Sequence, residues 1–128
     1  MKDAPILVVD DDPDALDIVQ TFLESQGYRV VTASSGREAL AKLEELRPAL
    51  VLLDVMMPEM DGWEVSRTIK NHPTLSGIRV VMLTARGEFA DKQEGLRAGA
   101  DDYIVKPIRL DELGQKVKRN LEAGRRAA

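Results

Sequence analysis

The sequence contains no cysteine, which excludes disulfide bonds and metal sites built from thiolates. It has no apolar run near the roughly 18 residues of a membrane span, and its amino terminus lacks the charged-then-apolar pattern of a secretion signal. An excess of positive charge is also missing, because the net charge is -4 at pH 7, which argues against nucleic-acid binding. These absences predict a cytoplasmic protein that contacts neither membrane nor nucleic acid.

What the sequence does contain is an alternation of short apolar runs with amphipathic stretches, over 128 residues that suffice for one domain. This alternation is typical of repeated βα units around a parallel sheet. The runs predict five strands, at Ile6–Asp10, Arg29–Ala33, Leu50–Asp54, Arg79–Thr84 and Tyr103–Lys106. The second run mixes polar and apolar residues and is expected at an edge of the sheet, whereas the first, third and fourth suit its buried centre. Residues 1–123 would form the domain, and residues 124–128 a frayed end or the start of a linker.

Five helices are expected between and after these strands. Pro13 suits the first position of the first helix, and Gly27 suits a left-handed residue just past its end. The run Ser35-Gly36-Arg37-Glu38 matches a capping box at the start of the second helix. The remaining helices are expected at residues 62–71, at 88–98 and from Arg109 onward. The helix at 88–98 has a thin apolar stripe, so we expect it to be the part of the domain that moves.

Charged and hydroxyl side chains stand at the carboxyl ends of the predicted strands. They are Asp10 and Asp11 at the end of the first strand, Asp54 in the third, Thr84 in the fourth and Lys106 in the fifth. Open parallel α/β sheets bind ligands outside the carboxyl ends of their strands, so these side chains are expected in one small site. Three carboxylates are hard oxygen ligands that favour Mg²⁺, or Mn²⁺, with waters and a backbone carbonyl from the loop at 55–57 completing the shell.

Asp54 is the candidate phosphoryl acceptor of this site. A carboxylate that ends an apolar strand is costly unless a cation compensates it, and Lys106 and the metal would supply that charge. A carboxylate can attack phosphorus to form an aspartyl-phosphate, while the cations neutralise the phosphoryl oxygens and the Thr84 hydroxyl donates a hydrogen bond to one of them. The simpler interpretation is that Asp11 and Asp12 only cap the first helix, and we assign that role mainly to Asp12.

With these residues placed, the whole chain resembles the receiver domain of two-component response regulators. The matching segments, in the order of that family, are Val8–Asp12, Leu53–Gly62, Leu83–Ala85 and Gly99–Pro107. The resemblance implies an α/β fold of the Rossmann-like, doubly wound (βα)5 type, also called flavodoxin-like or CheY-like, with a five-stranded parallel sheet in the order 2-1-3-4-5. It also implies a cis peptide bond between Lys106 and Pro107.

The resemblance assigns roles to the site residues. It implies that Asp54 is the phosphorylation site and that Mg²⁺ is held by Asp11, Asp54 and the backbone carbonyl of Met56, with Asp10 acting through water. A sensor histidine kinase or phosphotransfer protein would supply the phosphoryl group. The chain would catalyse only its own phosphorylation and dephosphorylation, and would not be an enzyme in the usual sense. Met56 offers no polar group to orient a water molecule, so we expect dephosphorylation to be slow.

The resemblance also implies a switch made of Thr84 and Tyr103. On phosphorylation, the Thr84 hydroxyl would move towards the phosphoryl group and the Tyr103 ring would turn inward. The alternative for Tyr103 is an ordinary half-buried strand aromatic with its hydroxyl in water. Through the switch, the face formed by helix four, strand five and helix five would bind a downstream effector protein or domain.

The segment from helix four to helix five also resembles that of receivers attached to winged-helix transcription regulators, and this resemblance implies a weak homodimer favoured by phosphorylation. In those receivers ion pairs join the two subunits through this face, and two such pairs are matched by position here, Lys92 with Glu112 and Asp102 with Lys116. Exposed ion pairs are worth only about 0–1 kcal/mol each. The alternative interpretation is that all four are solvated charges on the surface of a monomer.

Two other functions fit parts of the pattern. A haloacid-dehalogenase-type phosphatase also uses an aspartate nucleophile and Mg²⁺, but it needs a second aspartate at position 56, which is occupied by Met56. A pseudo-receiver would bind partners without phosphorylation, and the complete set of five site residues argues against it.

Overall fold

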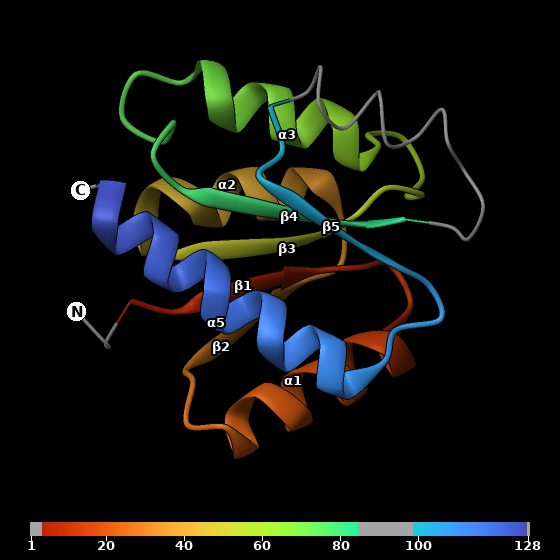
Figure 1. The fold of residues 1–128 in the computed structure, drawn as a ribbon. Helices are drawn as coiled ribbons and strands as arrows, with labels where there is room; N and C mark the ends of the chain where they lie inside the picture. Colours follow the sequence, from red (N-terminus) through yellow and green to blue (C-terminus); the bar gives the residue numbers. More distant parts are fainter. Residues whose placement is uncertain (1–3, 85–98, 128) are drawn as a thin grey trace.

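The computed structural model describes residues 4–84 and 99–127 and shows an α/β fold with one central parallel sheet (Figure 1). The strands lie in the order β2-β1-β3-β4-β5, and each neighbouring pair is parallel. Their bounds are Ile6–Val9 for β1, Val30–Ala33 for β2, Leu50–Asp54 for β3, Arg79–Thr84 for β4 and Asp102–Val105 for β5. The predicted fold class and strand order are confirmed, and the mixed strand β2 does lie at an edge.

Four helices within the described part of the chain cover the two faces of the sheet. They are α1 at Pro13–Ser25, α2 at Gly36–Leu46, α3 at Gly62–Asn71 and α5 at Leu110–Ala127. In Figure 1, α1 and α5 lie on one side of the sheet, and α2 and α3 lie on the other. The helix predicted at 88–98 falls outside the described residues. None of the described helices is both long enough and apolar enough to cross a membrane.

The helix starts follow the predicted capping signals, with one difference. Asp12 caps α1, since its side chain accepts a hydrogen bond of 3.0 Å from the Asp14 backbone N–H. Ser35 caps α2 in the same way, accepting from the Glu38 N–H at 3.1 Å. The Glu38 carboxylate, however, accepts from the backbone N–H of Ser34 at 2.8 Å and not from the N–H of Ser35 that a capping box requires. The reach of the side chain thus extends one residue further back than predicted.

Each face of the sheet has its own apolar core. The core under α1 and α5 includes Val8, Leu52 and Ile104, and the core under α2 and α3 includes Val9, Leu53 and Met82. Successive strand residues alternate between the two cores, because side chains in a strand point to opposite faces. Strands buried on both sides are therefore apolar throughout, and the polar residues are left to the strand ends.

Helix α5 differs from its prediction at its far end. It continues to Ala127, so the segment expected to fray is helical over residues 124–127. The division of the chain at residue 123 stays a prediction about domain organisation.

Candidate functional site

The parallel register gathers the predicted site residues at one edge of the sheet. Val9 pairs with Leu53, so Asp10, directly after β1, and Asp54, the last residue of β3, lie side by side. Thr84 ends β4 next to Val105 of β5, and the backbone N–H of Lys106 donates to the Thr84 carbonyl at 2.7 Å. Strands that end together therefore bring Asp10, Asp54 and Lys106 to the same edge of the sheet, where Thr84 also ends β4.

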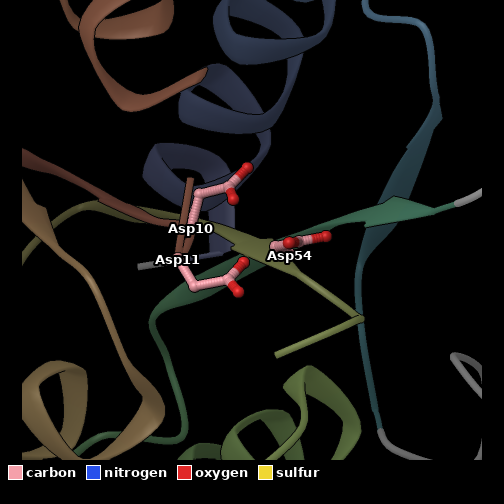
Figure 2. Close-up of side chains that lie close together, drawn as sticks. All are labelled: Asp10, Asp11 and Asp54. Atoms are coloured by element: carbon pink, nitrogen blue, oxygen red, sulfur yellow. The ribbon is translucent and has the colours of Figure 1, made fainter. Parts of the chain in front are cut away.

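Three carboxylates form the centre of this site. Asp10, Asp11 and Asp54 each offer an oxygen atom, and these oxygens all lie within 4.8 Å of one another (Figure 2). Asp10 and Asp54 are only 2% and 4% exposed, whereas Asp11 is exposed at the rim. The neighbouring Asp12 is not part of the cluster and caps α1 instead. Three converging carboxylate oxygens are the ligand type that Mg²⁺ prefers, so the donor set fits the predicted ion.

Lys106 supplies positive charge to the cluster. Its Nζ lies 3.0 Å from Asp54 Oδ1 and 3.6 Å from Asp10 Oδ2. Burial lowers the pKa of the Lys106 ammonium, but its pairing with Asp54 and Asp10 outweighs burial and raises that pKa overall. The peptide bond that follows, between Lys106 and Pro107, is cis, as the resemblance implied.

Asp54 is not fully compensated by this lysine. Burial raises the pKa of the Asp54 carboxyl; the hydrogen bond from Lys106 lowers it, and the nearby charge of Asp10 raises it again. The net direction is upward, although the same ion pair also raises the pKa of Lys106. The pKa of Asp54 and the pKa of Lys106 can both be raised because one ammonium faces two buried carboxylates. The cluster therefore lacks positive charge, which a divalent cation would supply.

The loop after β3 returns to the site through a close backbone contact. The Gly62 N–H donates to the Val55 carbonyl at 3.0 Å, and a Cβ atom at position 62 would lie 2.3 Å from the Asp54 carbonyl oxygen. Only glycine fits there, which is a role that sequence reasoning missed. The available signal was the pair Asp61-Gly62 at the predicted start of a helix. Met56, inside the loop, is 71% exposed, and its carbonyl stays a predicted metal ligand.

The predicted switch residues lie on neighbouring strands. Thr84 is buried at the end of β4, and Tyr103 lies on β5 opposite Met82. The Tyr103 side chain is partly buried and packs against the core under α2 and α3. This position agrees with the half-buried aromatic considered above, and the switch role stays a prediction.

The charges predicted to join two subunits are already paired within this chain. Asp102 lies 3.5 Å from Lys116, and it also accepts hydrogen bonds from Arg119 at 2.6 Å and Asn120 at 3.0 Å. Burial raises the pKa of Asp102, but these partners outweigh it and lower that pKa overall. Lys116 also lies 3.6 Å from Glu112. The fourth charge, Lys92, falls outside the described residues.

Comparison with known proteins agrees with this geometry. The family described as "Response regulator receiver domain" matches residues 6–118. The alkaline phosphatase synthesis transcriptional regulatory protein PhoP of Bacillus subtilis is 44% identical over 123 residues, which are 96% of this chain and 50% of PhoP. The chain thus spans about half the length of the curated relatives it matches.

Solved structures give the same result. A putative response regulator from Chloroflexus aurantiacus superposes with a TM-score of 0.91 and 36% identity, covering 94% of this chain and 99% of that one. A CheY-like receiver domain protein from Methanospirillum hungatei gives a TM-score of 0.88 at 35% identity, covering 97% of this chain and 98% of that one. The chain therefore belongs to the receiver domains of two-component response regulators.

Proposed function

We propose that this receiver domain accepts a phosphoryl group on Asp54 from a sensor histidine kinase or a phosphotransfer protein. The observation that carries the proposal is the cluster of Asp10, Asp11 and Asp54 beside Lys106. A nearly buried carboxylate with an ammonium at 3.0 Å is placed to attack phosphorus while a cation balances the incoming charge. A phosphatase of the haloacid dehalogenase type is disfavoured, since position 56 carries a thioether where that chemistry needs an acid.

Each residue of the cluster has its own proposed role. Asp11, Asp54 and the Met56 carbonyl would hold Mg²⁺, with Asp10 acting through water, and the bound ion would neutralise charge on the phosphoryl oxygens. A carboxylate oxygen of Asp54 is the nucleophile. The Lys106 ammonium would neutralise the negative charge on one phosphoryl oxygen, and the Thr84 hydroxyl would donate a hydrogen bond to another. Phosphoryl transfer needs this positioning and charge balance more than proton transfer. The catalysis is limited to the domain's own phosphorylation and dephosphorylation.

The signal would leave through the face that contains β5 and α5. Thr84 and Tyr103 are the proposed switch, and a downstream effector protein or domain is the proposed partner. Among the relatives are proteins named transcriptional regulators, which are about twice as long as this chain. We place the receiver domain at residues 1–123 and its action in the cytoplasm, without direct contact of this domain with nucleic acid or membrane.

The experiment is phosphorylation by acetyl phosphate and Mg²⁺, followed by intact-mass spectrometry. The wild type should gain one phosphoryl group, and Asp54→Asn should gain none. Asp11→Asn should lose labelling because the metal is lost. Asp12→Asn is the matched control, since it removes the adjacent charge while asparagine still caps α1. Undiminished labelling of Asp54→Asn would exclude Asp54 as the acceptor.

A further inference from the structure

Lys116 reaches around the edge of the sheet from one core to the other. Its helix, α5, buries Leu113 and Val117 in the same core as Ile104 of β5. The neighbouring side chain, Tyr103, packs against the core on the opposite face. Nevertheless, the Lys116 Nζ lies 4.9 Å from the centre of the Tyr103 ring and donates to the Tyr103 carbonyl at 2.5 Å.

The ammonium is held at this place from several sides. Asp102 lies 3.5 Å from it and Glu112 lies 3.6 Å from it, while the Lys116 side chain is only 19% exposed. A cation near an aromatic ring attracts it more strongly when both are shielded from water. The ring of Tyr103 therefore faces a cation that its surroundings keep in a fixed position.

The position of the Lys116 ammonium is not explained by neutralisation of the Asp102 carboxylate alone. The Asp102 carboxylate already accepts from Arg119 at 2.6 Å, from Asn120 at 3.0 Å and from the Tyr103 backbone N–H at 2.8 Å. Lys116 is at 3.5 Å, the longest of these contacts to Asp102, whereas its hydrogen bond to the Tyr103 carbonyl is much shorter. The geometry is better described as a lysine directed at Tyr103, with Asp102 and Glu112 steering it.

We propose that Lys116 is a positioning residue for Tyr103, which keeps the ring at the edge of β5 while the domain is unphosphorylated. This inference rests on the proposed switch role of Tyr103 and names what opposes the switch. For the ring to turn inward, its contact with the ammonium must break. The ammonium would then be available, on the surface of α5, to pair with an acidic group of a partner protein. Since coupling is reciprocal, a partner that binds Lys116 also makes the inward turn easier.

The first test reads the ring directly, before any phosphorylation. In a Tyr28→Phe background, Tyr103 is the single tyrosine of the chain, so ring-labelled tyrosine gives one set of nuclear magnetic resonance signals. Lys116→Gln should shift these signals, Lys116→Arg should keep them near their original position, and Lys118→Gln should leave them unchanged. Lys118 is the matched control because it is an exposed lysine of the same helix. Should Lys116→Gln fail to fold, Lys116→Met replaces it.

The second test measures activation with beryllofluoride, a phosphoryl analogue. Lys116→Gln should bind beryllofluoride about two- to five-fold more tightly than the wild type, the range expected for removing one cation–ring contact. Lys116→Arg should restore the original affinity. Unchanged ring signals in Lys116→Gln, or beryllofluoride binding that is unchanged or weaker in this variant, would overturn the inference. If the wild type failed to bind beryllofluoride at all, the proposed function would be wrong, and the ring signals would still decide the role of Lys116.

Discussion

The pKa of the Asp54 carboxyl is raised first by burial and then by the charge of Asp10, and Lys106 only partly offsets both. A group whose folded pKa is raised stabilises the fold at a pH below its unfolded pKa, and this contribution is lost as the pH rises through the folded pKa. At neutral pH without Mg²⁺, the ionised Asp54 therefore destabilises the domain. The same carboxylate is the proposed phosphoryl acceptor.

The first prediction follows from this sign. Without Mg²⁺ at pH 7, Asp54→Asn should be more stable than the wild type by about 1 kcal/mol, because asparagine carries no charge for burial and Asp10 to oppose. The difference should shrink as the pH falls through the folded pKa of Asp54 and be absent at about pH 2, well below the unfolded pKa, where the carboxyl is neutral in both states. Urea unfolding at the two pH values measures it, with Asp17→Asn, an exposed aspartate of α1, as the control for net charge. A less stable Asp54→Asn at pH 7 would contradict the charge balance described here.

The second prediction is that Met56 lengthens the lifetime of the aspartyl-phosphate. Its side chain is 71% exposed beside the site and provides no group that could orient an attacking water. An amide at this position adds one hydrogen bond of about 1 kcal/mol, which corresponds to a roughly fivefold change in rate. Met56→Asn should therefore lose its phosphoryl group about fivefold faster than the wild type in a decay assay. Equal or slower decay would refute the prediction, and Met56→Leu serves as the apolar control.

The site residues differ in how far the sequence could predict them. Asp10, Asp54 and Lys106 stand where short apolar runs end, and the carboxyl ends of parallel strands lie at the same edge of a sheet, so their convergence follows from the pattern alone. Gly62 was missed because its role depends on the path of the loop at 55–61, which brings two backbones together. Local sequence does not encode that approach.

At the scale of elements, the start of α2 is held by a charged cap. The Glu38 pKa is lowered to about 2, first by the hydrogen bond from the Ser34 backbone and then by Lys42 and the Ser34 hydroxyl. Lys42 lies one turn later, at 2.9 Å from the carboxylate. A depressed pKa means that Glu38 stabilises the fold above its unfolded pKa, and that this contribution disappears as the pH falls through the folded pKa.

The third prediction is thus a pH-dependent cap. The contribution of Glu38 should be complete above about pH 5 and lost progressively towards pH 2. Because the contact is exposed to solvent, it should amount to no more than about 1 kcal/mol. Glu38→Gln should be less stable than the wild type at pH 7 and equally stable near pH 2, measured by thermal unfolding. The control is Glu45→Gln on the same helix, and a constant difference across this range would contradict the prediction.

Packing between elements produced contacts that the sequence did not predict. Asp101 accepts from Lys70 of α3 and from the Val80 N–H of β4, both at 2.8 Å, and lies 3.3 Å from Arg79. Arg79 in turn donates to Asn120 of α5 at 2.9 Å. Each of these residues looks like a surface charge or amide in the sequence. Their network depends on how α3 and α5 cross the sheet, which periodicity does not fix.

At the scale of the whole molecule, the network at Asp102 bears on assembly. The homodimer prediction requires Asp102 and Lys116 to pair across two subunits, yet in this chain they lie 3.5 Å apart and Asp102 is also held by Arg119. Cross-subunit pairs would have to replace contacts that each subunit already makes. The net gain per pair is then small, even by the standard of exposed ion pairs, which are worth about 0–1 kcal/mol.

The last prediction is therefore a weak dimer that forms only when activated. Salt screens exposed charges over about 8–10 Å at ordinary ionic strength, so the dimer should weaken further as salt is added. Sedimentation velocity at high protein concentration should show a monomer without beryllofluoride, and partial dimer with it at low salt only. The variant Arg119→Gln removes the shortest internal partner of Asp102 and should shift the activated protein towards the dimer, whereas Lys118→Gln should not. If the activated wild type and the activated Arg119→Gln variant both stay monomeric at low salt, the homodimer prediction is wrong, and the face formed by β5 and α5 binds a different partner protein.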